Sequence, residues 1–257
     1  MIAWVNMRRR PEPTQPRNPH ELTLQQHVHS RWCISRFADG SGCVSVLRRA
    51  QPVPFPKKPE DEIFCAKRVW DQQTEAGFFK KIEDAFHREV SESLRLGTIS
   101  DHAAVTEYLA VWEVRSRLSE DPPNDVELAG PGEPPLSKDQ EEVIERKWGK
   151  FQRGTSLPGR FFAHARAIRL VDEIMSVYGG IRWGLARVRS VPGLICPDRP
   201  ASQAYIPIDR KHALVAEWQD RRIGPDDVAR WNRDSWSQSR DLVFGHPDDV
   251  IAFSRTL

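Results

Sequence analysis

Hydrophobic residues in the middle of the chain recur with the spacing of amphipathic helices. Between positions 78 and 94 they follow i, i+4 steps and form one apolar stripe, which is typical of a helix with one buried face. The same spacing, together with capping residues and helix breakers, predicts helices on both sides of this segment. Helices are expected over residues 22–37, 78–94, 101–118, 137–151, 159–178, 226–242 and 248–253.

Short strands with a period of two are predicted near both ends of the chain. Residues 43–47 alternate between apolar and polar directly after the glycine-rich turn at 39–42. Residues 182–188 and 211–218 also alternate, and 193–196 form a short apolar run, so we expect these three to share one antiparallel sheet. The patterns predict an α+β fold: a central helical bundle with a small, mostly antiparallel sheet built from strands near both ends of the chain, which are expected to pair.

Proline-rich stretches divide the chain. Residues 1–20 contain four prolines and no hydrophobic period, which predicts a disordered or extended leader. Residues 52–59 are expected to be a surface connector, and residues 120–136 a long exposed loop. The rest of the chain, residues 21–257, is predicted to form a single α+β domain.

Composition narrows the class of protein. The net charge is only +2 and the two signs are interspersed, so no basic tail or stripe indicates a nucleic-acid partner. The four cysteines are far apart and form no Cys-x-x-Cys pair, which favours free thiols in a reducing compartment. No segment has the run of about 18 apolar residues that a membrane helix needs. We therefore expect a cytoplasmic protein with no membrane span.

The sharpest chemical motif joins Pro197-Asp198 to Asp209-Arg210-Lys211. It resembles the Pro-Asp…(Asp/Glu)-x-Lys signature of restriction-endonuclease-like nucleases, and so keeps nucleic acid open as a partner. Two carboxylates at strand ends can hold a divalent metal such as Mg²⁺, and a lysine beside them can stabilise a pentavalent phosphate. The alternative is structural: Asp198 caps backbone amides in a turn, and Lys211 is a charge on an edge strand.

A second constellation combines His27, Arg31 and Glu83. On the expected first helix, His27 and Arg31 are i, i+4 neighbours on one face, and Glu83 flanks the apolar stripe of the next helix. A partly buried carboxylate needs a partner. The three side chains form either an acid–base or anion-binding site, or a structural ion pair that locks two helices, which the sequence favours. On a helix, His29 and His27 cannot share a metal.

Several segments, taken in order, resemble the bacterial domain-of-unknown-function family 4238. The opening motif of that family runs roughly His-Tyr-x-Pro-Gln-x-Tyr-Leu-x-x-Phe, and the residues that match it are His27, Ile34, Arg36 and Phe37. Ser30 stands where the family has proline, and Arg31 where it has glutamine. Further matching segments are 82–83, 194–200, 206–209 and 228–244. The resemblance spans about residues 25–245 and implies a bacterial protein with the architecture of that family. It implies no reaction, because the family has no established activity.

The leading hypothesis is a metal-dependent phosphodiester hydrolase of the nuclease kind. Asp198 and Asp209 would be the metal ligands and Lys211 the electrostatic stabiliser, while His27 or Glu83 would carry the proton. The competing hypothesis is a non-catalytic binding or interaction module, in which the same residues form ion pairs and caps. Carboxylates of Asp198 and Asp209 within about 5 Å of each other in an open cleft would favour the enzyme.

Overall fold

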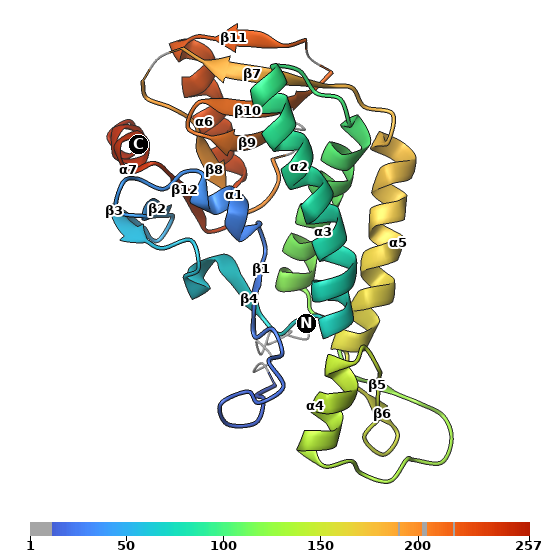
Figure 1. The fold of residues 1–257 in the computed structure, drawn as a ribbon. Coiled ribbons are helices and arrows are strands. Elements are labelled where there is room, and N and C mark those ends of the chain that lie inside the picture. Colours follow the sequence, from blue (N-terminus) through green and yellow to red (C-terminus); the bar gives the residue numbers. More distant parts are fainter. Residues whose placement is uncertain (1–11, 190, 202–204, 218) are drawn as a thin grey trace, which may run out of the picture.

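The computed structural model describes residues 12–189, 191–201, 205–217 and 219–257, and its architecture is α+β (Figure 1). Within these residues, seven α-helices accompany two four-stranded and two two-stranded sheets. The helices are α1 (Arg31–Ser35), α2 (Lys80–Leu96), α3 (His102–Glu120), α4 (Lys138–Arg146), α5 (Arg160–Tyr178), α6 (Pro225–Gln238) and α7 (Pro247–Ser254). The strands are β1 (Gln25–His27), β2 (Val44–Arg48), β3 (Gln51–Lys57), β4 (Cys65–Lys67), β5 (Val126–Glu127), β6 (Ser156–Leu157), β7 (Trp183–Val188), β8 (Ile195–Pro197), β9 (Tyr205–Asp209), β10 (His212–Ala216), β11 (Arg221–Ile223) and β12 (Leu242–Gly245). The expected fold class is confirmed, and a central helical bundle stays a prediction.

Three long helices pack side by side along one flank of the molecule, with α3 between α2 and α5 (Figure 1). Their positions follow the sequence pattern closely, because each helix has a continuous apolar face; α2, for example, buries Phe86 and Val90. Gly97 ends α2 in the left-handed conformation, with a φ of 89°, which residues with a side chain rarely adopt. The short turn that follows lets α3 return against α2.

The two four-stranded sheets are built from strands that are distant in sequence. Their strand orders are β3-β2-β12-β8 and β11-β7-β10-β9. β2 pairs antiparallel with β12, which confirms that strands near the two ends of the chain pair. The three segments expected in one sheet are split instead: β7 pairs with β10, whereas β8 pairs with β12. The alternation of apolar and polar residues along a strand indicates which side chains face the core. It does not indicate which strands pair with it.

Each of these sheets is buried on both faces, which explains its short apolar strands. In β12, Leu242 and Phe244 belong to the main core under α2 and α3, while Val243 packs with α7. In β10, Leu214 belongs to the main core, while Val215 packs with α6. Successive side chains of a strand point to opposite faces, so each strand contributes to two cores.

The helix expected over residues 22–37 is wrong for most of its length. Gln25–His27 form β1, which pairs with β4, and only Arg31–Ser35 are helical. The Gln26 side chain fixes the strand: its Nε2 donates to the Trp70 carbonyl at 2.7 Å, and its Oε1 accepts from the Val69 amide at 2.7 Å. These partners are 44 and 43 positions away in the sequence, so local periodicity carries no sign of them.

Two proline-rich stretches are more ordered than expected. Residues 51–57 form the edge strand β3 instead of a connector, and its prolines recur at every second position. This spacing places their missing N–H groups on the open edge of the sheet, where no donor is needed. Residues 12–20 form turns held by ion pairs, such as those from Glu12 to Lys138 and Arg153. The prediction of a disordered leader is therefore corrected for residues 12–20; residues 1–11 lie outside the described part.

The segment between α3 and α4 lies mostly at the surface, as expected for 120–136, although Val126–Glu127 pair with β6. The predicted capping box opens α4: the Ser137 hydroxyl accepts from the Gln140 amide, and the Gln140 side chain accepts from the Ser137 amide. Among the described residues, no helix is both long and apolar enough to cross a bilayer.

Candidate active site

A cleft of about 790 Å³, lined by many ionisable side chains, opens where β1 and α1 meet the start of α2. Its ionisable and hydroxyl lining includes His27, Ser30, Arg31, Glu75, Glu83, His87 and Arg115. Thr74–Phe79 form a π-helical turn that runs directly into α2 and carries Glu75. Such turns are frequent at functional sites, because the extra residue changes which side chains face a neighbouring element. The cleft thus gathers ionisable groups from a strand end, a short helix, a π-helical turn and two long helices.

Arg115 of α3 forms the floor of this cleft, with only 2% of its side chain exposed. Its Nη1 donates to Glu83 Oε1 at 2.5 Å, and its Nη2 lies 3.6 Å from Glu75 Oε2. The guanidinium also lies over the Phe79 ring, with Cζ 4.6 Å from the ring centre. A buried arginine is costly unless carboxylates compensate its charge, so Glu75, Arg115 and Glu83 form one electrostatic unit.

Burial and charge shift the proton affinities within this unit. Burial alone would lower the pKa of Arg115, but the carboxylates, Glu83 first, raise it, and the guanidinium stays charged. Burial raises the pKa of Glu75, against the opposing effects of Arg115 and of the hydrogen bond that Trp70 Nε1 donates at 2.6 Å. Glu75 is therefore held toward its protonated form.

His27, at the end of β1, has one ring nitrogen committed to the backbone. Its Nε2 lies 3.0 Å from the Pro59 carbonyl oxygen, and because a carbonyl only accepts, this nitrogen carries the proton. Burial lowers the pKa of His27, which keeps the ring neutral near pH 7. The other nitrogen, Nδ1, is then unprotonated, and no described residue hydrogen-bonds to it. The position has the properties of a general base.

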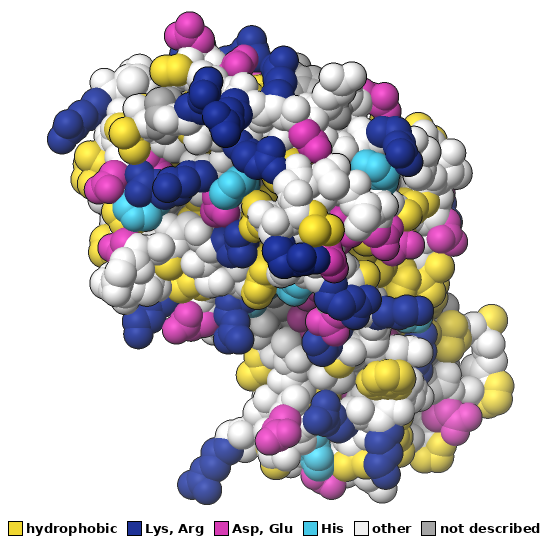
Figure 2. All heavy atoms as spheres, turned by 45° about the horizontal axis from the view of Figure 1, so that its top comes forward, with side chains coloured by type: hydrophobic (Ala, Val, Ile, Leu, Met, Phe, Trp, Pro, Cys, Tyr) yellow, Lys and Arg dark blue, Asp and Glu magenta, His cyan; other side chains and the backbone are white. Residues whose placement is uncertain are grey.

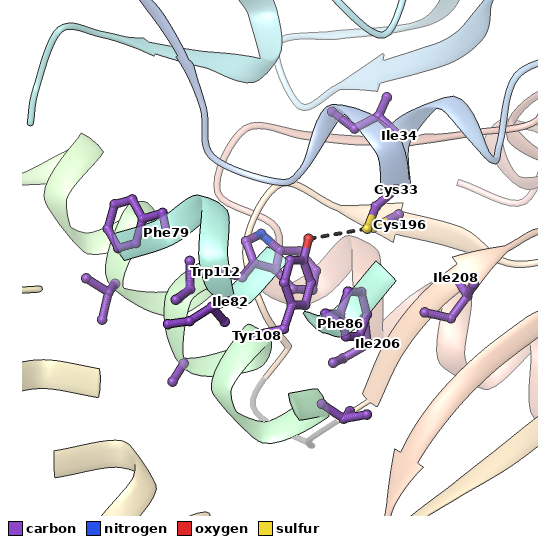
Figure 3. Close-up of a cluster of buried hydrophobic side chains, with 14 of the residues drawn as sticks. Cys33, Ile34, Phe79, Ile82, Phe86, Tyr108, Trp112, Cys196, Ile206 and Ile208 are labelled. Carbon is purple, nitrogen blue, oxygen red and sulfur yellow. Dashed lines mark hydrogen bonds between the residues drawn. The ribbon is translucent and has the colours of Figure 1, made fainter. Parts of the chain in front are cut away.

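A second histidine, His29, belongs to the core under the cleft and does not line it. Its Nδ1 lies 3.0 Å from the Tyr108 hydroxyl, and its ring packs on Trp112. The same hydroxyl lies 3.4 Å from Cys33 Sγ on α1 (Figure 3). Burial lowers the pKa of His29 to about 3 and raises that of Cys33 to about 12, so both are uncharged at neutral pH. This buried group fixes α1 against α3.

Asp198, one of the expected metal ligands, holds the backbone together. Its carboxylate accepts hydrogen bonds from the amides of Arg240, Asp241 and Leu242 at 2.8, 2.8 and 3.1 Å. These bonds join the end of β8 to the start of β12, which corresponds to the cap of the structural alternative. Within the described residues, no group of three or more His, Cys, Asp and Glu side chains is arranged to hold a metal.

Asp209, the other expected ligand, forms an ion-pair cluster. It accepts hydrogen bonds from Arg36 Nη2 at 3.0 Å and from the Lys211 amide at 2.7 Å, and His212 Nδ1 lies 2.9 Å from its Oδ1. Although burial opposes it, the hydrogen bond with His212 lowers the pKa of Asp209. The Lys211 side chain is exposed in the turn between β9 and β10. Both oxygens of Asp209 are thus engaged by protein donors.

Only one of the two constellations found in the sequence is gathered at the cleft. The lining contains His27, Arg31 and Glu83, and does not contain Asp198, Asp209 or Lys211. Sequence reasoning missed Arg115 and Glu75. The signal for Arg115 was a charged residue inside the mostly apolar stretch of α3, where an unpaired charge is not tolerated.

The surface outside the cleft mixes both signs of charge. Figure 2 shows Lys and Arg side chains interspersed with Asp and Glu across one face, with several basic residues close together toward the top. This distribution agrees with the small net charge of +2. The face drawn in Figure 2 carries no continuous basic stripe of the kind that nucleic-acid backbones attract.

The comparisons with known proteins identify no relative of this chain. The chain matches no family model, no curated protein and no solved structure. The resemblance to the domain-of-unknown-function family 4238 therefore stays a prediction, and the assignment of function depends on the geometry of the cleft.

Proposed function

We propose that the cleft is a hydrolytic active site in which His27 acts as the general base. The observation that carries this proposal is the state of the His27 ring: Nε2–H is tied to the Pro59 carbonyl, and Nδ1 has no partner among the described residues. A base is most useful when it is neutral and within reach of a bound water or hydroxyl. Burial of His27 lowers its pKa and provides the neutral form over a wide pH range.

Glu75 is the proton donor in this proposal. Its raised pKa favours the protonated carboxyl, while the neighbouring Glu83 stays paired with Arg115. Two ionisable groups whose surroundings favour opposite protonation states are the usual arrangement for acid and base in one site. The Glu83–Arg115 pair orients Glu75, which lies 3.6 Å from Arg115 Nη2, and supplies charge within the cleft.

Hydrolysis is retained from the sequence hypothesis, and its location moves to the cleft. Metal-dependent phosphodiester cleavage at Asp198 and Asp209 would require both carboxylates to give up their present donors. The cleft needs no such rearrangement. Its volume of about 790 Å³ suits a small polar substrate.

The test is turnover of small chromogenic substrates by the full chain. p-Nitrophenyl acetate, p-nitrophenyl phosphate and bis-p-nitrophenyl phosphate are each assayed with and without Mg²⁺. We expect one probe to be hydrolysed, and His27→Gln to lower kcat/KM by about 100-fold or more. His20→Gln, at a surface pair with Asp139 away from the cleft, is the matched control. If His27→Gln keeps full activity, His27 is not the general base.

A binding module is the second candidate, and the roles of Asp198 and Asp209 favour it. Both residues sit in caps and ion pairs, as that hypothesis requires. If the cleft only binds, the same probes shift the melting temperature without turnover, and Arg115→Met abolishes the shift. The pair of assays separates the two candidates.

A further inference from the structure

A serine and a histidine of the cleft form a pair that the proposed acid–base roles do not use. Ser30 Oγ lies 3.0 Å from His87 Nε2, and both residues line the cleft. Ser30 occupies the N-cap position of α1, where a serine hydroxyl ordinarily accepts from a helix amide. Here the hydroxyl makes no capping bond. It is turned toward the imidazole instead, at the cost of a local stabilising contact.

Both members of the pair are held in place from behind. The Ser30 amide donates to the Tyr108 hydroxyl at 3.3 Å, and Tyr108 stacks on Phe86 with ring centres 3.8 Å apart. The His87 ring stacks on Trp32, with ring centres 4.3 Å apart and an interplanar angle of 27°. A nucleophile and base within hydrogen-bond reach, with the base oriented by a third group, is the arrangement of covalent catalysis.

The charges around His87 suit a proton acceptor. Burial lowers the pKa of His87, so the ring is neutral at pH 7 and can accept. The carboxylates of Glu83 and Asp84 act in the opposite direction and favour the imidazolium that would form. Arg115 of the neighbouring helix α3 and Lys80 of α2 itself add positive charge, and Lys80 is paired with Asp84. In the tautomer protonated at Nδ1, Nε2 accepts the proton of the Ser30 hydroxyl.

We propose that Ser30 is a covalent nucleophile and His87 its general base, and that the substrate is a small carboxylic ester or thioester. The inference depends on the proposed function, in that it takes the cleft as the reaction site. Ser30 Oγ attacks the acyl carbon while its proton passes to His87. The bond to the leaving alcohol or thiol then breaks, and that group takes the proton from His87, which in this step replaces Glu75 as the proton donor. Water then attacks the acyl carbon while His27 takes one of its protons. The bond between the acyl carbon and Ser30 Oγ breaks, the carboxylic acid leaves, and the proton held by His27 returns to Ser30 Oγ.

An acyl substrate fits the remaining lining of the cleft. Trp32 and Ala38 supply apolar contact for an acyl chain. Arg31 follows Ser30 directly, lines the cleft, and has no carboxylate partner among the described residues. Its guanidinium is therefore available to donate to the oxyanion of a tetrahedral intermediate. A neutral ester is also compatible with a cleft whose lysine, arginine and acidic side chains nearly balance.

The experiment is covalent labelling of the full chain with a fluorophosphonate probe, followed by peptide mass spectrometry. Ser30 Oγ would displace fluoride from phosphorus, with its proton taken by His87. We expect label on Ser30, loss of label in Ser30→Ala, and at least about 100-fold slower labelling in His87→Gln. Ser35→Ala, which removes another serine of the same cleft and the same helix, should label like the parent chain.

Label that is absent from Ser30, or that forms equally fast in His87→Gln, overturns the inference. Ser30→Cys covers the case in which the alanine variant fails to fold: its thiol should be alkylated by iodoacetamide much faster than the buried Cys33. Equal rates for the two thiols also overturn it. If ester hydrolysis survives in Ser30→Ala and is lost in His27→Gln, the proposed function stands and the serine nucleophile is refuted. If Ser30 is labelled and His27→Gln keeps full hydrolysis, the serine nucleophile stands and the proposed role of His27 fails.

Discussion

Replacing Arg115 by methionine tests whether the buried charges under the cleft act as a unit. Methionine keeps the packing against Phe79 and removes the charge that compensates Glu83 and lies 3.6 Å from Glu75. Removing one partner of a buried ion pair costs about 3–5 kcal/mol, because the other charge stays buried. Each of the two carboxylates is 18% exposed, so water relieves part of the penalty. We therefore expect the lower end, about 3 kcal/mol of unfolding free energy.

The assay is urea unfolding at pH 7, followed by tryptophan fluorescence. Arg117→Met is the matched control, since Arg117 lies two positions further on the same helix in an exposed pair with Glu113; it should cost at most about 0.5 kcal/mol. Adding Glu83→Gln to Arg115→Met should recover about 1 kcal/mol or more, because it removes an uncompensated charge. A cost below about 1 kcal/mol for Arg115→Met, or strict additivity in the double variant, would refute the unit.

Three further outcomes follow from other contacts. Asp198→Ala loses three backbone bonds and should cost about 2 kcal/mol in urea unfolding, with no change in cleft activity. His29 has a folded pKa of about 3, below its unfolded value, so its contribution to stability is full above about pH 6.5 and falls as pH drops toward 3. The slope is up to about 1.4 kcal/mol per pH unit, and a pH series of unfolding midpoints in His29→Phe should lack it. Burial opposes ionisation of Glu12, but Arg153 and its other cationic partners hold the pKa well below the usual range. Glu12→Gln should therefore speed trypsin cleavage at Arg17 at pH 7, because the charge that Glu12 contributes to its ion pairs with Lys138, Arg153 and Arg160 is lost.

The helices were predictable because their signals are local. The capping box at Ser137 and Gln140 is contained within four residues and opens α4 where expected. The strand β1 was not predictable, since it depends on the Gln26 side chain reaching Trp70 and on pairing with β4. Strand β3 was hidden by its prolines, which are tolerated only because it is an edge strand. Non-local pairing decided each of these cases.

The candidate site shows the same division between local signals, which the sequence carries, and long-range contacts, which it does not reveal. His27, Arg31 and Glu83 were grouped in the sequence as neighbours across two helices, and they do share the cleft, although His27 lies on a strand. Arg115 is 32 positions from Glu83, so their pairing depends on how α2 packs against α3. The motif at Asp198 had the spacing of a metal site, but spacing does not specify which donors the folded chain provides to a carboxylate. Here the donors are backbone amides.

Departures from ideal local structure are concentrated around the cleft, and this concentration supports a functional role for it. A buried arginine, a π-helical turn and an N-cap serine that does not cap all surround one cleft. Each is less stable than an available alternative, and such departures are expected where function requires them. A buried ion pair by itself does not indicate a functional site, because Arg68, Glu145 and Arg160 form another one that joins structural elements. What distinguishes the cleft is that its charges lie beside a neutral histidine and a serine hydroxyl that makes no capping bond to the helix it starts.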